Sequence, residues 1–148
     1  MKKALAVAVV LAMVSPVMAA DHWNEQGDAP QLLPGQAVTG SGNLATINGS
    51  MTSGDADLYQ IMITDADTFR ADTSNQCQCD TQLFLFDADG MGVPMSDDGD
   101  EGLRSTITDQ FVNSTGIYYL AISQFDNDPL DGNGDEIWND GPFGEERQ

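Results

Sequence analysis

The feature that most constrains the fold is a series of short apolar runs separated by turn-forming residues. Each run has seven to nine residues and is rich in Ile, Val, Thr, Tyr and Phe, whereas Gly, Asp, Asn and Ser lie between them. β-branched and aromatic residues favour strands, and the separating residues favour turns. Outside the N-terminal leader, no stretch of eleven or more residues has the three-and-four spacing of an amphipathic helix. The runs, at residues 43–51, 57–64, 67–73, 81–87, 105–112 and 116–123, therefore predict an all-β domain.

The strongest runs are apolar on both faces. Successive side chains of a strand point to opposite sides, so Tyr59 and Ile61 share one face, and Leu58 and Met62 share the other. The run at 81–87 contains four consecutive apolar residues, LFLF. Such strands are typical of the centre of packed sheets, and six of them at this spacing indicate a sandwich or barrel. We expect the pairing to be antiparallel, because parallel crossovers need helical segments that the sequence lacks.

The first twenty residues have the pattern of a secretory signal peptide. Lys2 and Lys3 precede an apolar run at 4–14, and small residues mark a cleavage site near Ala19 or Ala20. The run is too short for a membrane span, and no later segment is apolar enough to form one. We therefore expect an exported protein, located in the periplasm, at the cell surface or outside the cell. The domain boundaries that we predict are a signal peptide at 1–20, an acidic N-terminal segment at 21–36 and a β-sandwich at 37–148 with an acidic C-terminal loop.

The charge of the chain excludes one class of partner. The sequence has 24 acidic and five basic residues, for a formal net charge of −19, and two of the basic residues lie in the leader. Such a protein repels phosphate backbones, so we expect no nucleic-acid partner. Cations and neutral polymers such as polysaccharides remain compatible with this charge.

Cys77 and Cys79 are the only cysteines of the chain. An exported protein permits a disulfide, but two residues of extended chain place the pair near the upper limit of bridging distance. A strained local disulfide on a turn is the first interpretation, and free thiols or an intermolecular link are the alternatives. Zinc is not expected, because structural zinc needs four ligands and the only histidine is His22.

The stretch DNDPLDGNGDEIWND, residues 126–140, holds six carboxylates and three asparagines. Like charges at this density repel one another unless solvent, salt or a bound cation screens them. The stretch does not fit the helix–loop–helix calcium template, because Glu136 and Pro142 stand where Gly and a bidentate Glu are required. A less regular calcium site and a solvated loop both remain open. The ligands of such a site would be Asp126, Asp128, Asp131, Asn133 and Asp135.

The sequence has no recognisable catalytic constellation. It lacks a Gly-x-Ser-x-Gly turn, and a phosphate loop ending in Lys is excluded because no lysine follows the leader. A triad would have to recruit His22 from the mature N-terminus. A carboxylate pair for glycoside hydrolysis is not excluded by composition, but no cleft can be inferred. We therefore expect no enzymatic activity.

Three segments taken together resemble the bacterial pre-peptidase C-terminal domain. They are NEQGDAPQLLPGQAVTGSGNLATINGSMTSGDADLYQIMIT, DTQLFLFDADGMGVPMSDDG and GIYYLAISQFDND, and they lie within residues 24–128. They carry Asp-x-Asp-x-Tyr at 55–59, Leu-x-Leu-x-Asp ending at Asp87, Asp-Asp at 97–98 and Gly-x-Tyr-Tyr-Leu at 116–120. The resemblance implies a β-sandwich of jelly-roll type that is appended to secreted hydrolases and is not itself catalytic.

The resemblance also implies a calcium site. Related domains of bacterial collagenases bind calcium where an acidic N-terminal segment meets the loop before the Asp-x-Asp-x-Tyr strand. Carried over to this chain, the ligands would be Glu25, Asp28, Asp55 and Asp57. The alternative is that Asp55 and Asp57 only shape a turn.

The sequence departs from the resembled domain at its C-terminal end. Members of that family usually close with a Gly-x-Tyr-x-Leu-x-Leu strand after the acidic loop, whereas this sequence ends in GPFGEERQ. We therefore expect a sandwich that lacks its last strand. Either the chain is truncated after Gln148, or the domain tolerates an open sheet edge that invites pairing with other chains.

Together these features predict a non-catalytic exported accessory or binding module that is stabilised by calcium. The first alternative is a carbohydrate- or matrix-binding module, in which an exposed Trp23, Trp138 or a tyrosine such as Tyr118 contacts a polysaccharide or a matrix protein. A small glycosidase is a third interpretation. Calcium-dependent melting would favour the first, ligand retention that depends on Trp138 the second, and turnover the third.

Overall fold

The computed structural model describes residues 22–40, 43–73, 79–98, 103–129, 138–139 and 146–147. The strands are β1 (His22–Asn24), β2 (Gln36–Ala37), β3 (Thr46–Asn48), β4 (Ala56–Ile63), β5 (Arg70–Asp72), β6 (Thr81–Phe86), β7 (Gly92–Ser96), β8 (Thr106–Thr108), β9 (Gly116–Gln124), β10 (Trp138–Asn139) and β11 (Glu146–Arg147). The one helical element in the described ranges is η1 (Asp109–Phe111), whose three residues fall far short of a bilayer crossing.

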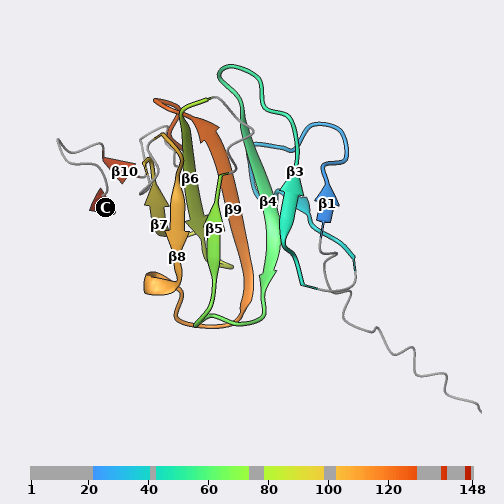
Figure 1. Ribbon diagram of the computed structural model, residues 1–148, viewed down its shortest axis with the longest axis vertical. Helices are drawn as coiled ribbons and strands as arrows, with labels where there is room; N and C mark the ends of the chain where they lie inside the picture. Colours follow the sequence, from blue (N-terminus) through green and yellow to red (C-terminus); the bar gives the residue numbers. More distant parts are fainter. Residues whose placement is uncertain are drawn as a thin grey trace, which may run out of the picture.

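The larger layer is a five-stranded sheet with the order β2-β4-β9-β6-β7 (Figure 1). Its centre is antiparallel: β9 pairs with β4 on one side and with β6 on the other. In this register Leu120 lies opposite both Tyr59 and Leu85. The three longest strands are thus the three central ones, as expected for segments that are apolar on both faces.

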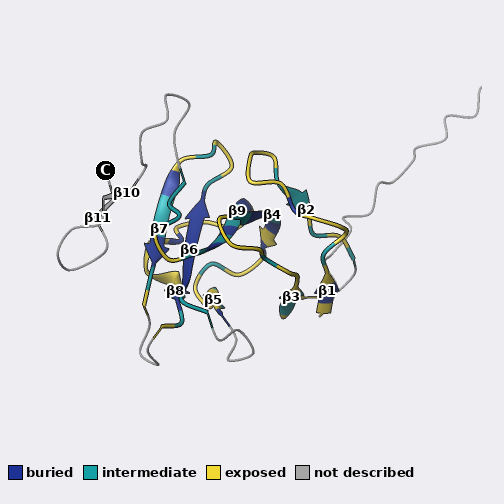
Figure 2. Ribbon diagram, turned by 90° about the horizontal axis from the view of Figure 1, so that it is seen from above, coloured by how far each residue is buried: buried dark blue, intermediate teal, exposed yellow. Residues whose placement is uncertain are grey.

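The second layer consists of two strand pairs, β1–β3 and β5–β8, which lie on the same side of the large sheet (Figure 2). The predicted all-β sandwich is confirmed. The expectation of purely antiparallel pairing is wrong for β1–β3 and β2–β4, which are parallel. In each parallel pair the connecting chain contains a strand of the opposite layer. A strand therefore provides the crossover for which we had expected a helix to be necessary.

The main core fills the space between the two layers. It contains Tyr59, Ile61 and Ile63 of β4, and these pack with residues of β1, β6, β8 and β9. A second apolar cluster, which includes Leu58 and Phe84, lies on the opposite face of the large sheet. All six residues of β6 are consequently buried. Burial of each large apolar side chain contributes about 1.5–3 kcal/mol to stability.

The acidic N-terminal segment is part of the sandwich. His22, which lies near the predicted mature N-terminus, pairs with Thr46 of β3. Trp23 is only 6% exposed, and its ring meets the ring of Tyr59 edge-on with centroids 5.9 Å apart. This contact fixes the start of the described chain against β4 and thereby places the residues after β1 at one end of the sandwich.

The turn between β6 and β7 contains Asp89 and Gly90, a dipeptide that is typical of hairpin turns. Gly90 has a φ of 80°, which favours glycine, and its N–H donates to the Asp87 carbonyl over 3.0 Å. The Asp87 carboxylate accepts from the N–H groups of Asp89 and Met91. Beyond this hairpin, β11 lies beside β7 and pairs with β10.

Candidate metal centre

Three carboxylates, those of Glu25, Asp28 and Asp57, meet where the N-terminal segment contacts the start of β4. Each offers an oxygen, and these oxygens all lie within 4.8 Å of one another. Glu25 directly follows β1, Asp28 lies in the next loop, and Asp57 is the second residue of β4. No other group of this kind occurs in the part of the chain that the structure describes.

Strand alternation explains why Asp57 points inward. Asp57, Tyr59 and Ile61 share the face of β4 that is directed at the second layer, and Asp57 pairs with Ile122 of β9. Its exposed fraction is 2%. A carboxylate at a core-facing position is costly unless a partner compensates for the lost hydration. Asp57 therefore needs a compensating donor or cation, and it is the first residue to consider as part of a functional site.

Glu25 is held rigidly by three donors. Its Oε1 accepts from the backbone N–H of Ala29 over 2.8 Å and from the hydroxyl of Tyr59 over 3.2 Å. Its Oε2 accepts from the backbone N–H of Ser50 over 3.0 Å. The backbone N–H of Glu25 in turn donates to the Asn48 carbonyl over 2.8 Å, which extends the β1–β3 pairing by one residue. The position of this carboxylate is therefore fixed by the backbone around it.

Gly49 gives the site its space. A Cβ atom at this position would lie 2.7 Å from the Tyr59 hydroxyl oxygen and 2.9 Å from Oε2 of Glu25. Both distances are shorter than carbon–oxygen van der Waals contact. Any side chain here would displace Tyr59 or Glu25, so the close approach of β3 to the cluster requires glycine.

The electrostatics of the cluster show an excess of negative charge. Burial, together with the charges of Glu25, Asp55 and Asp28, raises the pKa of Asp57 to about 7, and the Tyr59 hydroxyl opposes part of this shift. Burial and the nearby carboxylates also raise the pKa of Tyr59, which therefore keeps its proton and acts as a donor. Among the described residues, the buried Oδ1 of Asp57 has no hydrogen-bond partner.

The donor set fits a hard cation. All of the available ligand atoms are oxygens, which suit calcium or magnesium, whereas zinc prefers nitrogen and sulfur. Three carboxylates supply up to six oxygens, and calcium accepts six to eight in irregular geometry. A cation at this point would give the buried Oδ1 of Asp57 the partner that it lacks.

The fourth residue of the predicted ligand set, Asp55, is not part of the cluster. Its Oδ1 accepts from its neighbour's N–H at Ala56 over 2.9 Å and from the Gln31 side chain over 3.0 Å. Its Oδ2 accepts from the Thr52 hydroxyl over 3.5 Å. Asp55 thus shapes the turn before β4, whereas Asp57, to which the same interpretation gave a turn role, lies in β4 itself. Asp55 acts on Asp57 only through its charge.

Only two of the five ligands predicted for a calcium site in the C-terminal acidic stretch lie within the described residues. Asp126 and Asp128 do not join any group of three clustered ligands among the described residues. Asp126 instead adopts a positive φ of 62° in the turn after β9. Asp131, Asn133 and Asp135 lie outside the described residues.

Of the three aromatic residues predicted to contact a ligand, Trp23 and Tyr118 belong to the core. Each is 6% exposed, and the Tyr118 hydroxyl donates to the Ser114 carbonyl over 3.0 Å. The prediction that they are exposed is therefore wrong, because Trp23 packs on Tyr59 and the register of β9 turns the Tyr118 side chain toward the second layer. Trp138 lies in β10, and its side chain is not described.

Of the two cysteines of the chain, Cys79 is disulfide-bonded, and Cys77 lies outside the described residues.

Sequence reasoning did not find the groups that surround the carboxylates. Gly49 and Ser50 follow β3, and their proximity to Glu25 depends on the parallel β1–β3 pair. By itself, an Asn-Gly pair such as that at 48–49 indicates no more than a turn. Nothing in the local pattern connects it to a residue 24 positions earlier.

Comparison with known proteins finds no match, whether among family models, curated proteins or solved structures. The resemblance to the pre-peptidase C-terminal domain stays a prediction. A function for this chain must therefore be argued from its fold and from the geometry of the acidic cluster.

Proposed function

We propose that this protein is an exported, non-catalytic binding or accessory module in which calcium fastens the N-terminal segment onto the sandwich. The ligands are the carboxylates of Glu25, Asp28 and Asp57. The observation that carries the proposal is the buried Oδ1 of Asp57, which has no hydrogen-bond partner in the described part of the chain and lies among two further carboxylates.

The arrangement of the ligands indicates what calcium would do. Glu25 and Asp28 belong to the N-terminal segment, whereas Asp57 belongs to β4, so one ion joins two segments that are distant in sequence. Without the ion, three like charges repel one another at this junction. Because calcium binds only the folded arrangement, it adds about 2.7 kcal/mol of stability at a hundredfold excess over its dissociation constant.

The described residues give little support to the alternative of a glycosidase. Such an enzyme needs a carboxylate pair on either side of a cleft. Glu25 already accepts three hydrogen bonds, and a groove lined by Arg70 and Phe111 lies elsewhere in the described part of the chain. His22 is exposed in β1. A non-catalytic role is therefore the proposal that the described geometry supports best.

Thermal melting of the mature protein tests the calcium site. We expect the midpoint to rise with calcium between about 10⁻⁵ and 10⁻² M, a range that brackets the affinities of extracellular calcium modules. EDTA should reverse the rise, and magnesium should produce a smaller one because it tolerates irregular geometry poorly. Glu25→Gln and Asp57→Asn should each abolish the response.

Asp109→Asn is the matched control, because it removes one exposed carboxylate far along the chain in η1. It changes the net charge as the site variants do and should leave the calcium response intact. An unchanged midpoint in the unmodified protein, or an equal response in Asp57→Asn and Asp109→Asn, would remove calcium from this site.

A further inference from the structure

A groove with a cavity volume of about 290 Å³ lies between the two layers where β7 and β8 run next to each other. Its lining combines charged, amide and hydroxyl groups with apolar surface. The lining residues that bear on ligand binding are Arg70, Pro94, Asp98, Thr106, Gln110 and Phe111. In Figure 1, β8 and β1 lie in separate parts of the second layer, so the groove is distinct from the acidic cluster.

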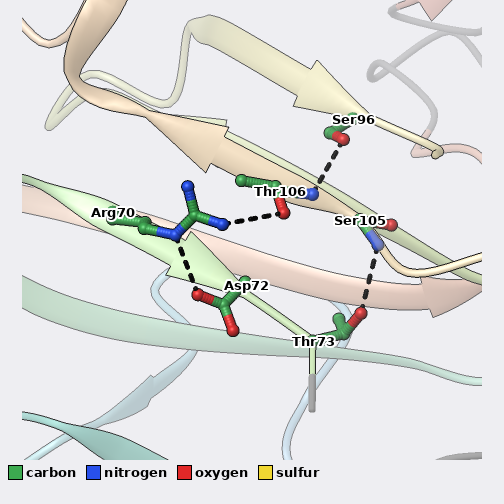
Figure 3. A network of polar contacts seen from close by, with 6 residues as sticks. All are labelled: Arg70, Asp72, Thr73, Ser96, Ser105 and Thr106. Atoms are coloured by element: carbon green, nitrogen blue, oxygen red, sulfur yellow. Dashed lines mark hydrogen bonds and ion pairs between the residues drawn. The ribbon is translucent and has the colours of Figure 1, made fainter. Parts of the chain in front are cut away.

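Arg70 is positioned at the groove by neighbours on two strands. Its Nε donates to the Asp72 carboxylate over 3.1 Å, and its Nη2 donates to the Thr106 hydroxyl over 3.5 Å. Figure 3 shows the guanidinium held between these two side chains. The remaining nitrogen, Nη1, has no partner among the residues that the structure describes. The side chains of Arg70 and Asp72 are both more than half exposed, so the guanidinium is accessible, and with a donor still available it is suited to recognise a polar ligand.

Buried hydroxyl groups hold the floor of the groove in place. The Ser96 hydroxyl accepts from the backbone N–H of Thr106 over 2.9 Å, which ties β7 to β8 (Figure 3). The Thr73 hydroxyl accepts from the backbone N–H of Ser105 over 3.1 Å, which ties β8 to the end of β5. Ser96 and Ser105 are 3% and 0% exposed. Buried hydroxyls must be hydrogen-bonded, and this network keeps the groove geometry defined before a ligand arrives.

The lining of the groove also includes an aromatic side chain. η1 presents Phe111 with half of its surface exposed, and the exposed amide of Gln110 precedes it. Pro94 of β7 adds apolar surface to the lining. An exposed aromatic ring beside planar hydrogen-bonding groups provides one apolar and one polar contact surface within a single groove.

From this combination we infer that the groove binds a neutral saccharide of one or two units. The C–H face of a pyranose ring packs on Phe111. Its vicinal hydroxyls accept hydrogen bonds from Arg70 and Gln110 and donate to Asp98. This inference goes beyond the proposed calcium site and does not depend on it.

The charge of the groove and of the whole protein selects a neutral ligand. Asp72 and Asp98 are close to the single guanidinium, and the formal net charge of the chain is −19. Phosphate, sulfate and uronate groups are repelled by this field, whereas uncharged hydroxyl groups are not. The negative charges around Arg70 thus cancel its long-range attraction for anions, but its guanidinium still donates hydrogen bonds at short range.

Affinity electrophoresis of the mature protein tests the inference with dextran, mannan, galactomannan and mixed-linkage β-glucan as soluble neutral probes. Polygalacturonate serves as the anionic comparator. At least one neutral polymer should retard the unmodified protein, equally in calcium and in EDTA. Arg70→Met and Phe111→Ser should each weaken this binding by about 10- to 100-fold, the effect of losing a charged hydrogen bond or an aromatic contact.

Phe125→Ser is the matched control, because Phe125 is 53% exposed but does not line the groove. It should be retarded like the unmodified protein, and thermal melting should show that all variants are folded. Gln110→Ala, at an exposed position, replaces Arg70→Met if that variant unfolds. Absence of retardation by all four neutral polymers overturns the inference, as does retardation that survives both groove substitutions. Stronger retardation by polygalacturonate overturns the assignment of a neutral ligand.

Discussion

Replacing Asp57 by Asn should stabilise the calcium-free protein at alkaline pH and make it insensitive to calcium. Asn has the shape of Asp, but it removes the charge that burial and the neighbouring carboxylates oppose. Its amide N–H groups can donate to the oxygens of Glu25 or Asp28, which lie within 4.8 Å of the Asp57 oxygen. A substitution that improves the empty site while destroying the filled one is a signature of a ligand position.

The size of the effect depends on the pKa of Asp57. That pKa is about 7 in the folded protein, compared with a reference value of 3.8. The folded state thus binds this proton more tightly than the unfolded state. Ionisation of Asp57 therefore costs stability progressively as the pH rises from about 4 to about 7, and the full cost applies above that range.

Each pKa unit corresponds to about 1.4 kcal/mol, so a shift of about three units gives roughly 4 kcal/mol at most. Because Asp28 is exposed, solvent and counterions reach the cluster and screen its charges, so we expect a stability gain of about 2 kcal/mol for Asp57→Asn. For a domain of this size, that difference raises the melting midpoint by roughly 6–10 °C.

Melting of Asp57→Asn and Asp109→Asn in EDTA at pH 4 and pH 8 checks this reasoning. Asp57→Asn should be the more stable variant at pH 8, and most of its advantage should disappear at pH 4, where the carboxyl group of Asp57 is protonated in the folded protein. Calcium at pH 8 should then stabilise only Asp109→Asn. Lower stability of Asp57→Asn at pH 8, or the same difference at both pH values, would refute the electrostatic argument.

Three further substitutions test the packing of the acidic cluster, of the apolar core and of the buried hydroxyl network. Gly49→Ala should weaken calcium binding at least tenfold in a calorimetric titration, because the new methyl group collides with Tyr59 and Glu25; unaltered affinity would contradict the described packing. Phe84→Ala should cost about 3–5 kcal/mol in urea unfolding, since Phe84 is 1% exposed; a loss below about 1 kcal/mol would place it outside the core. Ser105→Ala should cost about 1–3 kcal/mol in the same assay, because the single hydrogen of its buried hydroxyl is shared between the carbonyl oxygens of Thr81 and Asp97; no loss would mean that these carbonyls find other donors.

The long strands could be predicted from sequence because both of their faces carry apolar residues. The run at 57–64 corresponds to β4 at Ala56–Ile63, and the run at 116–123 corresponds to β9 at Gly116–Gln124. Three of the short strands, β3, β5 and β8, also lie within predicted runs, at 43–51, 67–73 and 105–112, whereas β1, β2 and β7 had no such signal. β2 has two residues, and β7 has five, one of which is Pro94, so neither shows a recognisable period.

The acidic cluster was predictable only in part. Glu25, Asp28 and Asp57 were expected from the order of motifs in the resembled domain, and the structure brings these three together. Asp55 was expected beside them, but its side chain turns back to its own loop. β4 begins at Ala56, so Asp57 is a core-facing strand residue, whereas Asp55 lies in the turn before the strand. A motif cannot reveal this difference unless the register of the strand is known.

The groove was not predicted from sequence at all. Arg70 and Phe111 are far apart in the chain, and their approach depends on the β5–β8 pair and on η1. The sequence instead suggested Tyr118, an aromatic residue in the strongest strand of the chain. The most apolar strands are the ones that a sandwich buries, and a binding aromatic is therefore better sought in a short connection such as η1.

Terbium luminescence tests the central claim, the cation site at Glu25, Asp28 and Asp57, most directly. This oxygen-seeking substitute for calcium emits when an adjacent tyrosine or tryptophan is excited. The Tyr59 hydroxyl lies 3.2 Å from Glu25, and the ring of Trp23 contacts that of Tyr59. In a Trp138→Phe background, which silences the tryptophan of the acidic C-terminal stretch, we predict sensitised emission that calcium displaces and Asp57→Asn abolishes. Absence of sensitised emission, or emission that persists in Asp57→Asn, would contradict the account.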